Sequence, residues 1–405
     1  MTTHLLVQAV LAADANPTPE PWRVITKMAY FIGLIGTTGL SMLYLLVLRP
    51  VLRRPSVDVR DRAVLDRRAS LLFAVAGTWF LVALYFQIAG KAARIKGKEI
   101  PYGEALSPAS IAKYLSTPGK TGEWISSGAL TLVQYLLWVA TAVVLMLLWS
   151  PRLRSRLTAI VATAFVLNFV AQNVTVIPTD FGKVSLDAIV DLNMSHLHVF
   201  AISTWVGGIA GLVALATTRR KLTPGAGTTW AQLWARFSTL ALVAVGCILI
   251  SGLFLAWTLI GSPSQLFTTS FGRFLLIKVS LVGTMILVGA VNEFVLMPRI
   301  ARARAAGEEG TVFRLALRAF PKLVGFEVAL AVGVLFVLSF LTGSARVEAG
   351  DPDPTLSGGI VAIGVLLAAM LAISFYATAK VSERLSRPDT QSSDAEPPTP
   401  VKTDA

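Results

Sequence analysis

The 405-residue chain is too apolar for an ordinary soluble domain, with 54% hydrophobic and 15% charged residues, whereas soluble domains are about one quarter charged. Its net charge of +13 does not indicate nucleic-acid binding, because the basic residues fall in short segments between apolar runs, where they orient membrane proteins. The single cysteine, Cys247, excludes an intramolecular disulfide and a thiolate cluster for metal. The composition therefore predicts a membrane protein.

Nine apolar runs come close to the ~20 residues that a helix needs to cross a bilayer. They span residues 25–48, 69–89, 127–149, 157–177, 192–217, 237–260, 272–297, 321–342 and 356–378. This pattern predicts an all-α fold, a polytopic membrane helical bundle with about nine transmembrane helices.

The basic residues predict how this bundle is oriented. When the N-terminus is placed outside, the inner segments carry 24 of the 36 lysines and arginines, as the positive-inside rule requires. The long loop 90–125 carries six basic residues on the outside, but long loops count little in this rule. We therefore predict that the N-terminus lies outside and the C-terminus in the cytoplasm.

The runs divide the chain into five parts. Residues 1–24 are an outer N-terminal tail, for which a cleaved signal peptide and an uncleaved tail are the two alternatives. Residues 25–178 form a four-helix membrane region, 179–345 a second four-helix domain, and 346–380 the final transmembrane helix. The polar, Pro-rich residues 381–405 are predicted to be a disordered cytoplasmic tail.

Small residues predict where the helices approach one another closely. Gly33, Gly36 and Gly39 line the first run, while Gly207 and Gly211 form a G-x-x-x-G step in the fifth. Because such residues let helix backbones pack at short range in membranes, the sequence predicts a tightly packed bundle and not a wide pore.

Two of the three histidines, His196 and His198, lie in the stretch NMSHLHVFAISTWVGG at residues 193–208. On a helix, Asp191, Met194 and His198 share one stripe with Trp205, and His196 lies about 200° away from His198. Two arrangements are open. Either Met194 and His198 share a site while His196 faces another helix, or the segment is unwound.

These residues predict a metal site. Imidazole suits copper in either oxidation state, and a thioether favours Cu(I). An ionisable group in a membrane span also indicates function, because burying it unpaired is costly. Asp191, Met194, His196 and His198 are therefore candidate ligands for Cu(I) or Cu(II). The structural alternative is a histidine that is hydrogen-bonded near the headgroups.

A fifth candidate ligand is His4 at the N-terminus. If Met1 were removed, the chain would begin Thr-Thr-His, in which the amine, two amides and an imidazole can enclose Cu(II) in its preferred square plane. Cleavage of a signal peptide would remove this site.

The stretch HVFAISTWVGG resembles the H-x6-W-x-G-G signature of the CopD family of bacterial inner-membrane copper-resistance proteins. The resemblance covers about residues 190–345 and makes 179–345 a CopD-like domain. It rests on His198, Trp205, Gly207, Gly208, Arg236, Phe237, Ser238, Ser251, Gly252, Gly272, Arg273, Lys278, Asn292 and Glu327.

The resemblance implies a copper-handling protein of the bacterial inner membrane that takes up copper from the periplasmic face or delivers it across the membrane. His198 would capture the metal, Trp205 would pack below it, and a small periplasmic copper carrier or a cuproenzyme would be the partner. Many relatives place another histidine near the end of the preceding helix, where this chain reads VAQNVTVIPTD. Either His196 substitutes for that histidine or the site has lost a ligand.

Charged residues near the ends of the runs are expected to be structural. Lys278 and Arg273 lie near the outer end of the seventh run, where long side chains can snorkel. Glu293, Glu327 and Lys322 are expected to form a salt-bridged clamp on the inner side, and an exit site is the alternative.

No enzymatic activity is predicted, and the expected partners are copper ion and membrane lipids, without nucleic acid. Two other functions stay open. One is an assembly scaffold for a respiratory oxidase that does not move metal. The other is a b-type cytochrome, although haem with two histidine ligands needs imidazoles from facing positions and the two in this stretch point apart.

Overall fold

The computed structural model describes residues 19–95, 99–316, 320–352 and 358–386. Within these residues the chain is helical and contains no strand, which confirms the predicted all-α fold. The predicted tails fall largely outside the described residues, and the last helix continues past residue 380 to Ser386.

Each predicted apolar run lies on a helix. The long helices are α2 (Pro21–Leu43), continued by the π-helical η1 (Tyr44–Leu48) and α3 (Arg49–Leu52); α4 (Val59–Ala92); α7 (Ser127–Met146); α8 (Leu157–Asn173); α9 (Leu186–Ala216); α10 (Ala226–Leu259); α12 (Ser270–Val291), continued by the π-helical η7 (Asn292–Leu296) and α13 (Met297–Ala305); α15 (Phe320–Leu338); and α17 (Gly358–Ser386). The short helices are α5 (Tyr102–Ala105), α6 (Pro108–Leu115), α11 (Gln265–Thr268), α14 (Glu309–Arg314) and α16 (Ala345–Ala349).

Among the described residues, seven helices are long and apolar enough to cross a membrane. The apolar parts of α15 and α17, Leu323–Leu338 and Gly364–Ser374, are shorter. The chain is therefore a polytopic helical membrane protein, and the count of nine spans stays a prediction for these last two helices.

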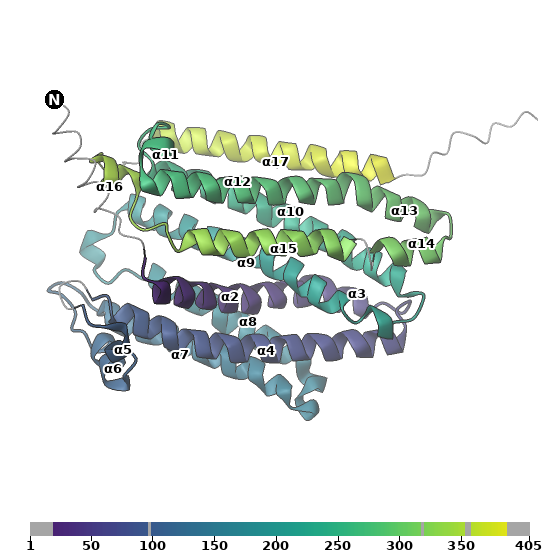
Figure 1. Cartoon of the computed structure of the whole chain (residues 1–405), viewed down its shortest axis with the longest axis horizontal. Helices are drawn as coiled ribbons and strands as arrows, with labels where there is room; N and C mark the ends of the chain where they lie inside the picture. The colour runs from purple at the N-terminus through teal and green to yellow at the C-terminus, as the bar shows by residue number, and fades with distance from the viewer. Residues whose placement is uncertain (1–18, 96–98, 317–319, 353–357, 387–405) are drawn as a thin grey trace, which may run out of the picture.

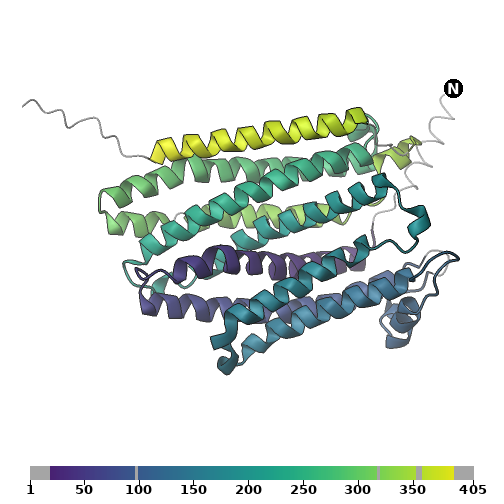
Figure 2. The same ribbon diagram turned by 180° about the vertical axis from the view of Figure 1, so that it is seen from behind.

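The long helices lie side by side along the long axis of the molecule (Figures 1 and 2). Helices α7 and α8 form one edge of the bundle, and α17 forms the other. Between them, α9 packs against α2, α10 and α15. The stretch that carries both central histidines therefore belongs to a helix with neighbours on several sides.

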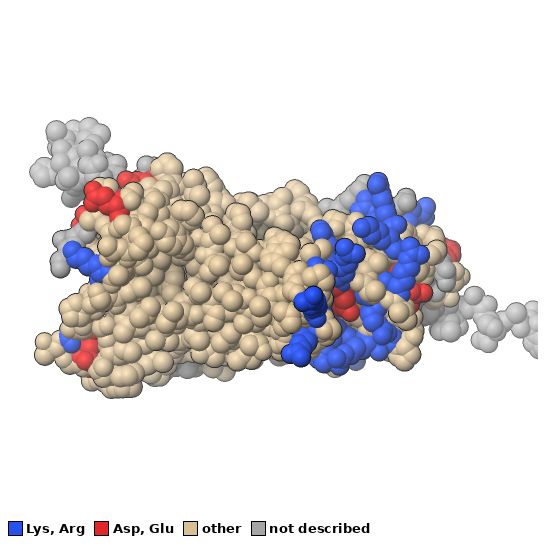
Figure 3. All heavy atoms as spheres, turned by 90° about the horizontal axis from the view of Figure 1, so that it is seen from below, with Lys and Arg blue, Asp and Glu red and all other residues tan. Residues whose placement is uncertain are grey.

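The two ends of the bundle differ in charge. On the face drawn in Figure 3, lysines and arginines gather at one end, and a broad belt without charged residues separates them from the other. This basic end holds the connections at 53–58, 150–156, 217–225 and 306–308. Helix α2 begins at the opposite end, whereas α17 ends at the basic end.

A buried carboxylate ties the helices together at the basic end. Asp61, in the first turn of α4, is 1% exposed. It accepts hydrogen bonds from the backbone N–H of Thr223 at 2.9 Å and from the hydroxyl of Thr223 at 2.7 Å. Because Thr223 precedes α10, this contact joins α4 to the connection between α9 and α10.

Helices α2 and α9 approach each other backbone to backbone, as the glycines predict. A Cβ atom at Gly39 would lie 2.5 Å from Cα of Gly207, and one at Gly207 would lie 2.8 Å from Cα of Gly39. The carbonyl oxygen of Ser203 would lie closer still to the Cβ at Gly39, and that of Ile35 closer still to the Cβ at Gly207. The atoms that crowd both positions are backbone atoms, so neither helix can yield by turning a side chain. The contact also crosses the predicted boundary between 25–178 and 179–345, which stays a prediction.

We expect Gly207→Ala to destabilise the bundle, because its methyl group would force α2 and α9 apart. Overpacking of this kind costs about 1–3 kcal/mol, which a lower midpoint of thermal unfolding in detergent would report. Gly289→Ala on α12 is the matched control, since nothing lies within 4 Å of a Cβ there. Equal midpoints for the two variants would contradict the close approach.

Candidate metal site

Helix α9 displays the two central histidines on different faces. It begins after Ser185, whose hydroxyl accepts a hydrogen bond from the N–H of Ala188 at 3.2 Å, as expected of an N-cap. The helix is regular from Leu186 to Ala216, so the unwound alternative is wrong. His196 and His198 therefore face different neighbours.

His198 is held by α10. Its Nδ1 atom lies 3.0 Å from the hydroxyl of Ser251, and that hydroxyl lies 2.5 Å from the carbonyl oxygen of Cys247. A serine hydroxyl has one proton to donate, and the carbonyl oxygen can only accept. The hydroxyl therefore donates to Cys247 and accepts from Nδ1–H, which leaves the lone pair on Nε2 of His198 free to bind a ligand.

Gly252 gives the imidazole ring room to lie against α10. A Cβ atom at this position would lie 3.3 Å from Cε1 of His198 and 3.7 Å from its Nδ1. The adjacent residues Ser251 and Gly252 thus act on His198 in two ways: the serine fixes the tautomer of the imidazole, and the glycine leaves space for the ring.

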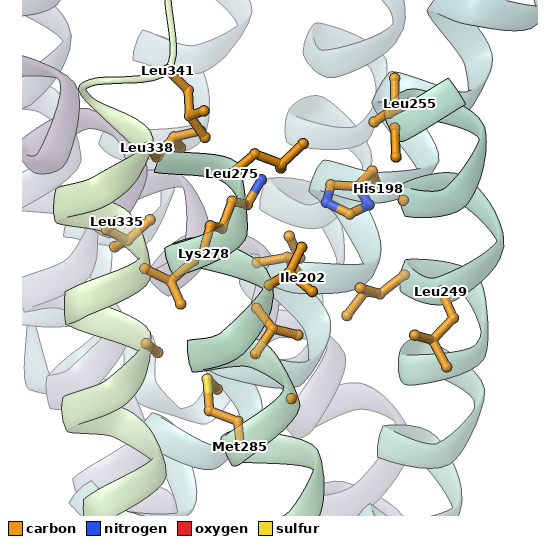
Figure 4. A pocket seen from close by; sticks show the side chains of 18 of the residues that line it. His198, Ile202, Leu249, Leu255, Leu275, Lys278, Met285, Leu335, Leu338 and Leu341 are labelled. Atoms are coloured by element: carbon orange, nitrogen blue, oxygen red, sulfur yellow. The ribbon is translucent and has the colours of Figure 1, made fainter. Parts of the chain in front are cut away.

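His198 opens onto a cavity of about 440 Å³ between α9, α10, α12 and α15. Most of the lining is aliphatic, and Lys278 is the other charged or ionisable residue among the lining residues. Figure 4 shows the amine of Lys278 and the ring of His198 pointing toward one another. Trp205 and Met285 also line this cavity, and Trp205 follows His198 by seven residues on α9.

The other candidate ligands lie elsewhere. The Nε2 atom of His196 is 3.3 Å from the hydroxyl of Thr175, and its Nδ1 is buried without a hydrogen-bond partner. Asp191 is exposed, and neither it nor Met194 lines the cavity. His4 lies outside the described residues. In the part of the chain that the structure describes, no three His, Cys, Asp or Glu side chains come together as a metal cluster. The ligand roles of these four residues, and of His198, therefore stay predictions.

Comparison with known proteins bears on the helices that surround this cavity. Residues 231–341 match the family model described as Copper resistance protein D. The resemblance to the CopD family is confirmed for this segment.

A curated relative points the same way. The copper transport protein CutJ of Bacillus subtilis (strain 168) is 39% identical over 114 residues, which are 28% of this chain and 21% of the relative. The chain thus spans about one fifth of the length of the curated relative that it matches. No solved structure matches the chain.

The CopD segment supplies three walls of the cavity. It contains Ser251, Gly252 and the cavity-lining parts of α10, α12 and α15, but α9 and the predicted His198 motif precede it. The imidazole thus comes from outside the matched segment, whereas the groups that fix and surround it come from within.

Lys278 and Met285 are cavity residues that the sequence did not reveal as such. Lys278 was expected to snorkel outward, but its side chain points into the cavity (Figure 4). Met285 is 1% exposed and stands seven residues later, on the same face of α12. This spacing was the available signal, although apolar faces of ordinary helices show it too.

The two glutamates of the expected inner clamp each accept a hydrogen bond from an uncharged side chain. Glu327 accepts a hydrogen bond from the side-chain amide of Asn292 at 2.9 Å, and Glu293 accepts one from the hydroxyl of Ser238. The side chain of Lys322 lies outside the described residues. These two hydrogen bonds come from different helices, and the clamp with Lys322 stays a prediction.

We expect Ser251→Ala to release the tautomer of His198, because Nδ1–H would lose its acceptor. With three histidines in the chain, ring ¹⁵N chemical shifts can resolve His198. The unmodified protein should show a single Nδ1–H tautomer, and the variant a mixture. Thr175→Ala, next to His196, is the control and should leave the His198 signals unchanged. An Nε2–H tautomer in the unmodified protein would contradict the assignment.

Proposed function

We propose that the protein handles copper in the bacterial inner membrane, admitting the ion from the periplasmic face into the cavity beside His198. From there it passes the ion across the membrane or to a cuproprotein, without acting as an enzyme. The observation that carries this proposal is the contact of His198 Nδ1 with the hydroxyl of Ser251, which itself donates to Cys247; this arrangement favours a proton on Nδ1 and leaves Nε2 available. A neutral imidazole with one fixed nitrogen is the usual form of a metal-binding histidine.

The metal is proposed from the family. The matching model and the curated relative are both named for copper, and imidazole suits copper well. The sulfur of Met285 provides a soft ligand deeper in the same cavity, as Cu(I) prefers. Asp191 and Met194 lie on α9 before His198, so we assign them to the entrance, where they would meet the ion first.

The orientation is proposed from charge. The positive-inside rule assigns the basic end of the bundle to the cytoplasm. The start of α9 then lies on the periplasmic side, and His198 lies roughly 18 Å along the helix from Leu186 at 1.5 Å per residue. Copper would therefore reach His198 within the outer half of the membrane.

Lys278 sets an electrostatic condition on this site. A protonated amine facing His198 would repel a copper ion there, whereas a deprotonated amine would offer the ion a nitrogen ligand. In both cases copper binding and protonation of Lys278 oppose each other. A periplasmic copper carrier remains the proposed partner, because it would supply the ion at the outer face.

The rival functions have less support. Haem with two histidine ligands needs facing imidazoles, whereas His196 and His198 stand on different faces of one helix. A reduced-minus-oxidised optical spectrum without haem bands would dismiss that function. A respiratory-oxidase scaffold differs in transport: copper uptake into proteoliposomes supports our proposal, whereas retained binding to an oxidase subunit without uptake supports the scaffold.

We expect His198→Ala to weaken copper binding by about tenfold or more, equivalent to at least ~1.4 kcal/mol for one lost ligand. Titration of the detergent-purified protein with Cu(I) or Cu(II) measures this loss. His196→Ala is the matched control and should have the smaller effect, because its imidazole faces Thr175 and not the cavity. An unchanged affinity in His198→Ala would refute the site.

A further inference from the structure

A buried carboxyl group stands at the basic side of the cavity. Glu327, on α15, is 2% exposed, and its hydrogen bond comes from Asn292, which is 6% exposed. Among the described side chains, no lysine, arginine or histidine is bonded to it. A carboxylate that is shielded from water by apolar helices and lacks a cation is costly.

Asn292 has an unused acceptor at the same place. Its Nδ2 donates to Oε1 of Glu327 at 2.9 Å, while its Oδ1 is buried and has no hydrogen-bond partner. The residue also begins η7, the π-helical stretch Asn292–Leu296. Such stretches within α-helices are frequently found at functional sites.

The protonation state of Glu327 decides whether this amide can be satisfied. An ionised carboxylate only accepts hydrogen bonds, so it offers nothing to Oδ1 of Asn292. A protonated carboxyl has one O–H to donate, and an amide facing an acid can exchange two hydrogen bonds with it. We propose that Glu327 is a proton-binding site, occupied at neutral pH, in which the carboxyl donates its proton to Oδ1 of Asn292.

Among the described side chains on the elements that pack against α15, none supplies the missing charge. Glu293, the neighbour of Asn292 on η7, is bound by Ser238 of α10 and is itself acidic. The other ionisable residues on the elements that pack against α15 lie toward the opposite end: Arg273 and Lys278 on α12; Asp187, Asp191, His196 and His198 on α9; and Arg23, Lys27 and Tyr30 on α2. Lys278 precedes Asn292 by roughly 21 Å of helix, at 1.5 Å per residue.

The cavity leads toward this site. Met285 and Ala331 line it, and Ala331 lies one helical turn beyond Glu327 on α15. If the proposed copper function holds, a copper ion that moves inward from His198 approaches a protonated acid. Ion binding there would displace the proton, so that the negative charge of Glu327 becomes available to the cation. Copper passage would then be coupled to proton release.

Infrared spectroscopy of the detergent-purified, metal-free protein tests the proton site without reference to copper. We expect the C=O stretch of a protonated, hydrogen-bonded carboxylic acid at neutral pH, lost in Glu327→Gln and retained in Glu293→Gln. The glutamine has the shape of the protonated acid and should preserve the fold. Absence of the band, or its loss in Glu293→Gln instead, would overturn the proposal.

A second variant keeps the test decisive if Glu327→Gln does not fold. Asn292→Ala removes the proposed acceptor, so the same band should shift to the position of a less strongly hydrogen-bonded acid. A band that does not move would overturn the pairing with Asn292.

The link to copper has its own readout. Protons released on adding copper, followed with a pH indicator in weak buffer, should be fewer for Glu327→Gln than for the unmodified protein. Equal release at equal copper binding would overturn the coupling while sparing the proposed function. No copper binding by the unmodified protein would refute the proposed function, and the infrared result would stand independently.

Discussion

Helices α2 and α9 touch through their backbones at Gly39 and Gly207, and the position of α9 follows from that contact. Helix α9, held close to α2, also packs against α10 and α15. The two histidines of α9 therefore have different neighbours: His196 lies beside Thr175, and His198 lies beside Ser251. In a membrane, where no hydrophobic effect drives helices together, such close packing of small residues replaces it.

Polar groups along the cavity are few and are placed at its two ends. His198 and Lys278 face each other toward one end, while Asn292 and Glu327 meet beyond the other. Between them the lining is aliphatic except for Trp205 and the thioether of Met285. A low-dielectric surrounding strengthens every charge–charge and charge–dipole interaction in the cavity. Under the proposed function, protonation of these few groups would control which ions the cavity accepts.

The arrangement also separates two roles within the chain. The CopD segment builds the walls of the cavity and supplies the serine that orients the imidazole, whereas the imidazole itself comes from α9, before the match begins. The contact of α9 with α2 then connects the site to the N-terminal helices. The N-terminal region thus positions the site although it contributes none of the polar groups in the cavity.

Local patterns determined much of this protein without its structure. Apolar run length predicted the helices, glycine spacing predicted that the first and fifth runs pack closely against other helices, and the 100° turn per residue predicted that His196 and His198 point apart. These features depend on residues close together in the chain.

The partners of the functional groups were decided only by tertiary structure. Ser251 lies 53 residues from His198, and Glu327 lies 35 residues from Asn292, so no helical period connects them. The rotation of α12 likewise decided that Lys278 enters the cavity and does not snorkel. The pattern of a single helix specifies which of its residues share a face. Which helix that face contacts depends on how all the helices pack, because every contact involves residues of two helices.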